Sequence, residues 1–349
     1  MKKGYAYIIL TTIIFSTMEI ALKLVSGTFN PIQLTFTRFF IGGLFLMPFA
    51  LNNLRKKKSY ILASDLCYFA FLGLLGIVIS MVLYQLAVLN TPASVVAVLF
   101  SCNPVFVIIF AFFLLKEAIY KNNVLALILE VIGTVIIINP FNIKLSVPGI
   151  TLTIVSTLTF ALYGVLGKKK CAKYGGIVVT CFGFLFGSLE MLILIGISHI
   201  TLIADWFSSN GLKIFSNIPI FIGYSLHTLP IIAYICIINT GVGFACYFKS
   251  MEETSAQTTS LVFFFKPILA PILALIILHE AIPFNMLAGI LFILSGSLSS
   301  ILPGLINIKD FPGNMQLNRA EVKTQCIISI IPEEISIKKG DENVEQDKY

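Results

Sequence analysis

The chain has 349 residues, of which 57% are hydrophobic and only 12% are charged, and its net charge is +7 at neutral pH. Soluble domains carry about 25% charged residues, so this composition excludes an ordinary soluble fold and predicts an integral membrane protein. Because Lys and Arg beside membrane spans set the orientation of such a protein, the basic excess does not indicate nucleic-acid binding.

Ten segments are long and apolar enough to be expected as transmembrane helices, for which about 20 residues are needed. In chain order they cover residues 5–25, 31–51, 65–89, 93–115, 122–139, 148–167, 177–199, 226–248, 256–278 and 284–302. Asn-Pro at 30–31 and 139–140 and Thr-Pro at 91–92 predict turns between them. A signal peptide is the alternative for the first segment, but its length and its internal Glu19 and Lys23 favour a retained helix. The expected fold class is therefore all-α integral membrane.

The distribution of basic residues predicts that both termini lie in the cytoplasm and that the protein is a multi-pass protein of the plasma membrane. With the N-terminus inside, the outer loops carry only Lys144 and Lys213. The cytoplasmic segments before the tail carry Lys2, Lys3, Arg55, Lys56, Lys57, Lys58, Lys116, Lys121, Lys168, Lys169, Lys170, Lys173 and Lys249. This is the bias that the positive-inside rule requires. The polar tail, 303–349, is expected to be a mostly disordered cytoplasmic extension in which 324–331 could form a strand.

The two halves of the chain resemble each other. Residues 84–123 align without a gap on 247–286 at an offset of 163 residues, and the first helix of each half aligns at an offset of 145. The matched pairs include Gly4 with Gly149, Lys23 with Lys168, Tyr84 with Tyr247, Pro104 with Pro267 and Glu117 with Glu280. The difference in offset predicts an insertion around 201–217, which contains Trp206, a candidate interfacial anchor.

These matches predict two five-helix repeats, 4–140 and 148–302. Since five is odd, the second repeat enters the membrane from the opposite side. Inverted repeats of this kind are typical of secondary transporters, whose substrate site lies between the halves near the middle of the membrane.

Four motifs carry a resemblance to a known family. They are NPIQLTFTRFF at 30–40, TPASVVAVLFSCNPVFVIIFAFFLLKEAI at 91–119, NTGVGFACYF at 239–248 and TSAQTTSLVFFFKPILAPILALIILHEAI at 254–282. Through them, residues 4–302 resemble the EamA-type ten-helix members of the drug/metabolite transporter superfamily. The resemblance implies a carrier that moves small metabolites, amino acids or drugs, often outward. It also implies a central cavity lined by the first, third, fourth, sixth, eighth and ninth helices.

Lys266 is the ionisable residue expected nearest the middle of the membrane. It lies about ten residues from either end of its segment, roughly 15 Å from each surface at 1.5 Å per residue. Pro267 and Pro271 remove backbone donors beside it, which is tolerated only where protein or a cavity satisfies the freed groups. Lys266 is therefore a candidate ligand for a substrate carboxylate or phosphate. The alternatives are a structural ion pair with Glu190 or Glu130, and a role in proton transfer or gating.

Other ionisable residues lie inside predicted spans, where each would cost about 2.5–3.5 kcal/mol facing lipid. Glu19 and Lys23 have the spacing of a helical ion pair, with cavity lining as the alternative. Arg38 is seven residues into its span, so we expect it to reach the outer headgroups as a structural anchor. Glu130 and Glu190 are candidates for proton coupling.

The remaining candidates are gating residues and polar groups in the cavity helices. Glu117 and Glu280 end the fourth and ninth helices, where a carboxylate can accept hydrogen bonds from the amides that open the next helix. Pro104, Pro267 and Pro271 are the candidate hinges. The polar candidates for substrate contact are Tyr84, Gln85, Asn103, Tyr163, Asn239, Thr240 and Tyr247. Gly73, Gly76, Gly133, Gly289 and Gly296 are expected to serve close helix packing.

We therefore expect a secondary transporter of small metabolites (amino acids, organic anions or drugs) that exports by alternating access. The alternatives are a polytopic scaffold or receptor, which needs no inverted symmetry, and a membrane-embedded enzyme, which would gather polar residues at one surface. The Cys and His residues have no metal-ligand spacing and no nucleotide-binding motif is present. The expected partners are the bilayer and a small-molecule substrate, with no cofactor, metal or nucleic acid; a homodimer is left open.

Overall fold

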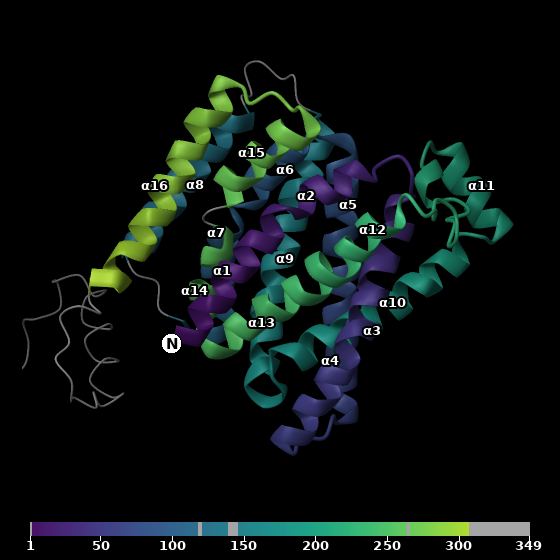
Figure 1. Cartoon of the computed structure of the whole chain (residues 1–349), viewed down its shortest axis with the longest axis horizontal. Coiled ribbons are helices and arrows are strands. Elements are labelled where there is room, and N and C mark those ends of the chain that lie inside the picture. Colours follow the sequence, from purple (N-terminus) through teal and green to yellow (C-terminus); the bar gives the residue numbers. More distant parts are fainter. Residues whose placement is uncertain (1, 118–120, 139–145, 264–265, 307–349) are drawn as a thin grey trace, which may run out of the picture. The chain divides into compact units, whose positions relative to one another are not determined.

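The computed structural model describes residues 2–117, 121–138, 146–263 and 266–306. The Asn-Pro turn at 139–140, the tail from 307 onward and its predicted strand at 324–331 lie outside these residues. The described residues form helices and no strand (Figure 1).

The first half contributes five spans, several of which consist of shorter helical pieces. The first comprises α1 (Lys2–Ser16) and α2 (Met18–Leu24), and the second is α3 (Pro31–Lys57). The third runs through α4 (Ala63–Gly73), the π-helical η1 (Leu74–Met81) and α5 (Val82–Asn90). The fourth is divided into α6 (Ala93–Phe100) and α7 (Asn103–Leu115), and the fifth is α8 (Lys121–Ile138).

The second half has the same sequence of pieces with an insertion. It begins with α9 (Val147–Tyr174) and α10 (Gly176–Ile197), followed by α11 (Thr201–Ser209) and the 3₁₀ turn η2 (Lys213–Phe215). The next span joins α12 (Leu229–Ala233), the π-helical η3 (Tyr234–Val242) and α13 (Gly243–Glu253). The last two comprise α14 (Ala256–Thr259), the 3₁₀ turn η4 (Ser260–Phe263) and α15 (Lys266–Leu278), and then α16 (Phe284–Ile306).

The predicted ten-helix membrane fold is confirmed. Eight helical segments are long and apolar enough to cross a membrane, and two shorter apolar stretches, Val124–Ile137 and Phe284–Gly296, occupy the fifth and tenth positions. The predicted ends of the second and sixth spans, 51 and 167, were too early. Both helices continue through basic residues to Lys57 and Tyr174 because charged side chains are well solvated beyond the hydrocarbon.

Local sequence explains where several helices begin. The Asn30 side chain accepts a hydrogen bond from the Ile32 amide at 2.8 Å, and Pro31 opens the helix, so Asn-Pro at 30–31 is the N-cap and first turn of α3. Pro92 stands at the N-cap position of α6, where it makes no side-chain cap. The break between α6 and α7 falls just before Pro104, the second residue of α7.

The bundle buries aromatic and aliphatic side chains together with small and polar ones, and further large apolar side chains are exposed on its outside. α3 packs on α10, α1 on α13, α7 on α9 and α6 on α15. α8 lies beside α16 (Figure 1), where a Cβ on Gly133 would come within 2.6 Å of the Gly289 carbonyl oxygen. Gly73 approaches the Gly187 backbone just as closely, so close packing at these predicted glycines is confirmed.

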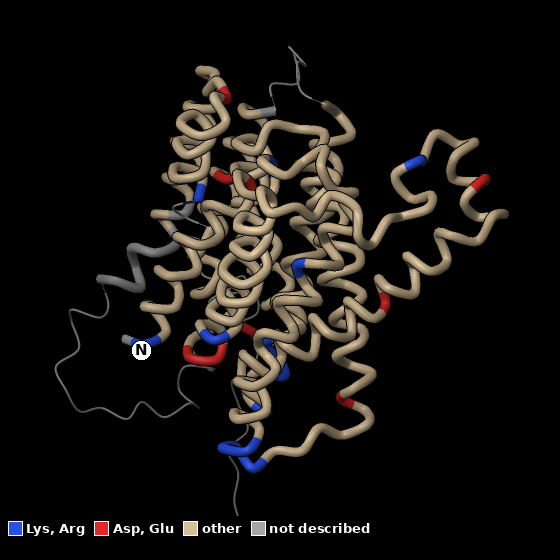
Figure 2. Tube along the Cα trace, turned by 45° about the vertical axis from the view of Figure 1, so that its right-hand side comes forward, with Lys and Arg blue, Asp and Glu red and all other residues tan. Residues whose placement is uncertain are grey.

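Charged residues are concentrated at one end of the bundle. Figure 2 shows a dense group of Lys and Arg where α3 is followed by α4. The insertion predicted at 201–217 contains α11 and η2, which project to one side of the bundle (Figure 1). Trp206 on α11 is exposed, so an interfacial role remains a prediction.

Candidate functional site

A cluster of capping contacts, which we call the first capping cluster, closes one end of the bundle. The Glu280 carboxylate accepts hydrogen bonds from the Ala93 amide at 2.8 Å and from the Ser94 amide at 2.9 Å. Lys23 donates to the carbonyl oxygens of Val88 at 2.8 Å and Thr91 at 3.2 Å. The acid thus caps the start of α6, while the amine caps the end of α5.

A second capping cluster repeats this arrangement at the other end. The Glu117 carboxylate accepts from the amides of Ala256 at 3.3 Å and Gln257 at 3.4 Å, at the start of α14. Lys168 donates to the carbonyl oxygens of Met251 and, at 2.6 Å, Thr254, at the end of α13. Its members correspond to those of the first cluster at the offsets of 145 and 163 residues.

The backbone conformation just before each glutamate is also the same in the two clusters. Lys116 and His279, which end α7 and α15, both adopt left-handed conformations, with φ of 57° and 55°. In both places the glutamate follows directly after this left-handed residue. The prediction that the two acids cap the next helix was wrong, because each caps a helix of the other half: Glu117 reaches α14 and Glu280 reaches α6.

A third group of charges, the central cluster, lies between the halves and is buried. Lys266, the first residue of α15, forms an ion pair with Glu19 of α2 at 2.5 Å, and both side chains are at most 2% exposed. The amine also faces three rings, with centroids at 4.8 Å for Phe100, 5.7 Å for Phe263 and 5.9 Å for Tyr84. These rings stabilise the cation further in the low-dielectric interior.

The space beside this ion pair is a cavity of about 10 Å³, which is too small to hold a substrate in this conformation. Its walls are formed by Phe15, Met18, Met81, Tyr84, Phe100, Phe160, Phe244 and Lys266. These residues come from both halves of the chain. The small volume indicates an occluded arrangement of the central cluster.

The buried charges have partners other than those expected. Lys266 forms the buried ion pair that was the alternative to substrate contact, but with Glu19 and not with Glu130 or Glu190. Glu19 does not pair with Lys23, because Lys23 extends to the α5 carbonyls. Arg38 does not reach the headgroups. It is fully buried, with its guanidinium 4.7 Å from the Phe39 ring and in the electrostatic field of Glu19.

Sequence reasoning missed Arg38 as a central residue, although a signal was present. Gly42 follows it by one helical turn on the same face of α3, and a Cβ there would lie 3.1 Å from the Cys236 carbonyl oxygen. A face that carries such a small residue is a helix-packing face. The glycine therefore indicates that Arg38 points into the protein.

The other predicted site residues are buried around the central cluster or near it. Tyr247 contacts Phe15 and Phe160, and Tyr163 contacts Phe160. Asn239 accepts a hydrogen bond from Thr17 at 3.2 Å, and Asn103 donates to the Thr157 carbonyl oxygen at 3.2 Å. The further candidates are Gln85 and Thr240, both buried, Pro267 and Pro271 on α15, Glu130, buried on α8, and Glu190, partly buried on α10.

Additional ion pairs hold the basic end of the bundle together. Asp65 of α4 pairs with Lys170 and, at 2.8 Å, with Lys173 of α9. Glu252 of α13 pairs with Lys57 of α3 at 2.8 Å, joining spans from both halves. These contacts were not anticipated, because sequence analysis treated the basic residues only as topological signals.

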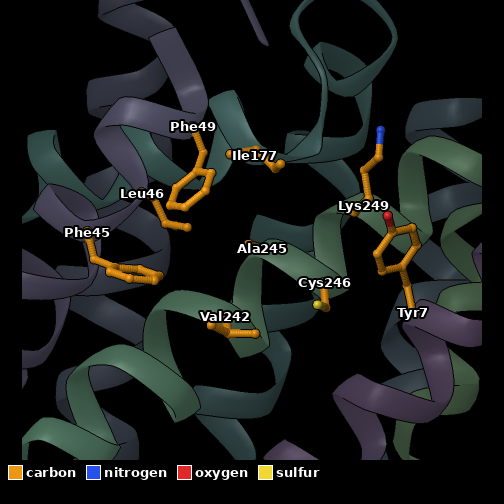
Figure 3. A pocket seen from close by; sticks show the side chains of 9 residues that line it. All are labelled: Tyr7, Phe45, Leu46, Phe49, Ile177, Val242, Ala245, Cys246 and Lys249. Carbon is orange, nitrogen blue, oxygen red and sulfur yellow. The ribbon is translucent and has the colours of Figure 1, made fainter. Parts of the chain in front are cut away.

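A larger cavity, of about 220 Å³, opens at the side of the bundle and contains none of the predicted site residues. Figure 3 shows the rings of Phe45 and Phe49 from α3 on one side and Tyr7 from α1 on the other. The rest of the wall is formed by Leu46, Ile177, Val242, Ala245, Cys246 and Lys249. This apolar lining suits a lipid chain better than a charged substrate.

The fold and the matched clusters define a helical membrane protein whose two halves interlock. The sequence matches the EamA-like transporter family over residues 2–139 and 147–302, and the chain belongs to this family. A transporter of uncharacterized function from Clostridium kluyveri is 39% identical over 306 residues, covering 85% of this chain and 93% of that protein. Another from Archaeoglobus fulgidus is 25% identical, covering 85% and 97%.

A protein solved by crystallography has the same fold. It aligns with a TM-score of 0.63 over 86% of this chain and 98% of its own, at 17% sequence identity. The chain is thus a multi-pass membrane protein of a transporter family.

Proposed function

We propose that the protein is a secondary transporter that exports small metabolites across the plasma membrane by alternating access. The observation that carries this proposal is the pair of matched capping clusters. Each one closes one end of the bundle and takes its acid from the other half. A scaffold or receptor has no need of two equivalent closures around a buried charged centre.

The mechanism follows from an inverted relation between the halves, 4–140 and 148–302. Opening one end separates Glu280 from α6, or Glu117 from α14, and exposes the central cluster to that side. Because the two clusters are equivalent, the same movement performed by the other half opens the other end. Both clusters are intact here and the cavity at the centre measures only about 10 Å³, which supports an occluded intermediate between the two open forms.

The orientation proposed for the cycle places both termini in the cytoplasm. The second capping cluster then faces the cytoplasm with the dense basic group, and the first faces outward. Pro104 and Pro267, at equivalent positions, are the second residues of α7 and α15. We propose that the halves bend at these prolines.

A membrane-embedded enzyme is the less supported alternative. Within the described residues, no group of three or more His, Cys, Asp or Glu has an arrangement suited to a metal. The polar residues gather at the centre and at both ends, whereas an enzyme of this kind is expected to gather them at one surface.

The test is transport by purified protein in sealed vesicles, screened against amino acids, organic anions and organic cations. Counterflow of at least one class, abolished by Lys266→Ala and retained by a control variant in the exposed part of α3, Arg55→Gln, supports the proposal. Vesicles that contain folded protein and move no compound in any class would contradict it.

A further inference from the structure

Arg38 has more hydrogen-bonding capacity than its surroundings use. Its Nη1 group donates to the Met18 sulfur at 3.8 Å, which is a weak acceptor, while Nε and Nη2 have no hydrogen-bond partner among the described residues. The side chain is fully buried, so bulk water does not solvate it. A buried guanidinium in this condition costs folding free energy unless something binds it.

The charges of the central cluster do not balance. Glu19 is the acid of the cluster, and its charge is matched by the ion pair with Lys266 at 2.5 Å. Arg38 adds a second cation, and no ion-pair contact joins it to Glu19 in the described part of the chain. The cluster as a whole therefore carries one positive charge in excess.

Aromatic rings surround the cavity beside Lys266, and Arg38 is linked to its wall through the hydrogen bond to Met18. Phe160 contacts Phe100, Phe244 and Phe263, with ring centroids 5.3–6.1 Å apart. Tyr163 and Tyr247 also contact Phe160, and their buried hydroxyl groups have no hydrogen-bond partner among the described residues. Such walls suit an apolar, preferably aromatic, body rather than a sugar or a polyphosphate.

Resting on the proposed transport function, we propose that the substrate is a monoanionic organic acid with an aromatic or bulky apolar body. Arg38 binds its carboxylate through the fork of Nε and Nη2, which matches the geometry of two carboxylate oxygens. Glu19 holds Lys266 and excludes a second anionic group. The aromatic walls enclose the body when the cavity widens.

The test uses four probes that share a phenyl ring and differ in charge: phenylpropionate, phenylpropanamide, phenylpropylammonium and phenylalanine. Binding is measured as the rise in unfolding temperature of purified protein, which grows with ligand concentration over Kd. Phenylpropionate is expected to stabilise the wild type most. A stronger effect of the ammonium compound or of zwitterionic phenylalanine, or no effect of phenylpropionate up to millimolar concentration, would overturn the proposal.

Variants separate a binding role of Arg38 from a structural one. Arg38→Gln is expected to weaken phenylpropionate binding roughly 30-fold or more, while Arg55→Gln on the exposed part of the same helix leaves it unchanged. Arg38→Met is expected to raise the unfolding temperature without ligand, because it removes an unpaired buried charge. An Arg38→Met protein that is less stable and binds phenylpropionate normally would make Arg38 structural.

The experiments distinguish a failure of the anion-site proposal from a failure of the proposed transport function. Binding of phenylpropionate without counterflow of any compound would contradict the transport function and leave the anion site standing. Transport of cations or zwitterions with no preference for phenylpropionate would overturn the anion site and leave the transport function standing. If the Arg38 variants do not fold, the charge series on the wild type decides alone.

Discussion

Buried polar groups have different kinds of partner at the centre and at the ends of this molecule. At the ends, Glu117, Glu280, Lys23 and Lys168 each cap backbone groups of a neighbouring helix. At the centre, Glu19 and Lys266 form an ion pair, but Oε2 of Glu19 and two donors of Arg38 have no hydrogen-bond partner among the described residues. The capping groups at the ends therefore have their partners, whereas Arg38 at the centre lacks the anion that we propose it binds.

This difference distinguishes the residues that close the ends of the bundle from the residue that we propose binds the substrate. A cap that satisfies helix ends is worth about 0.5–2 kcal/mol, which is small enough to be broken and remade during a transport cycle. An unpaired buried charge is an unfavourable feature that folding alone does not explain. A locally unfavourable feature such as an unpaired buried charge is expected at functional sites.

The largest effect is expected from breaking the central ion pair. Lys266→Ala leaves the Glu19 carboxylate buried without its partner, which should cost about 3–5 kcal/mol of stability and abolish transport. Thermal unfolding and vesicle counterflow measure the two losses. The double variant Glu19→Gln/Lys266→Met should regain most of the stability and none of the transport. Restored transport in the double variant would show that the pair is only structural.

A smaller effect is expected at the ends. Glu280→Gln and Glu117→Gln keep the shape of the side chain but remove its charge, so each cap should weaken by about 1 kcal/mol. Transport should slow by about tenfold or less, with stability nearly unchanged. If the free energy of unfolding of either variant falls by as much as its slower transport corresponds to, the result would argue against a gating role and for a purely structural cap.

The lysines of the capping clusters are expected to matter less than the acids. Lys23→Met and Lys168→Met each remove hydrogen bonds to carbonyl oxygens at a helix C-terminus, worth about 0.3–1 kcal/mol. Initial transport rates of the two variants should fall by similar factors, because the contacts are equivalent. A large loss for one and none for the other would weaken the equivalence of the two ends.

The smallest effect is expected from Arg55→Gln, the matched control for Arg38. Arg55 is exposed near the end of α3, and a surface substitution of this kind changes stability by less than about 0.5 kcal/mol. Vesicle transport and unfolding temperature should match the wild type. A strong effect at Arg55 would show that the basic end, not the centre, controls substrate binding.

Much of the fold could be predicted from sequence because hydrophobicity and helix-breaking residues act locally. The ten spans, the Asn30–Pro31 helix start and the packing glycines Gly73 and Gly133 are features of this kind. Partner choice could not be predicted. Glu19 has Lys23 one turn away, yet it pairs with Lys266, 247 positions along the chain. Only the packing of α2 against α15 decides between them.

The partners of the capping acids, Glu117 and Glu280, could not be predicted from sequence either. Their helix-end positions indicated that they would bind backbone amides, and they do. Their target helices depend on the left-handed turns at Lys116 and His279 and on the interlocking of the halves. A sequence pattern therefore predicts which kind of group such a residue binds more readily than it predicts which helix supplies that group.

The central claim is that the two ends open alternately, and paired cysteine labelling tests it most directly. Ala93 and Ala256, the first residues of α6 and α14, are both fully buried in this closed form. In a background without native cysteines, Ala93→Cys and Ala256→Cys report on the first and second ends. Glu280→Gln should increase labelling at 93 and decrease it at 256, and Glu117→Gln should do the reverse. If both positions rise together, or neither responds, the two ends are not coupled and alternating access through them is contradicted.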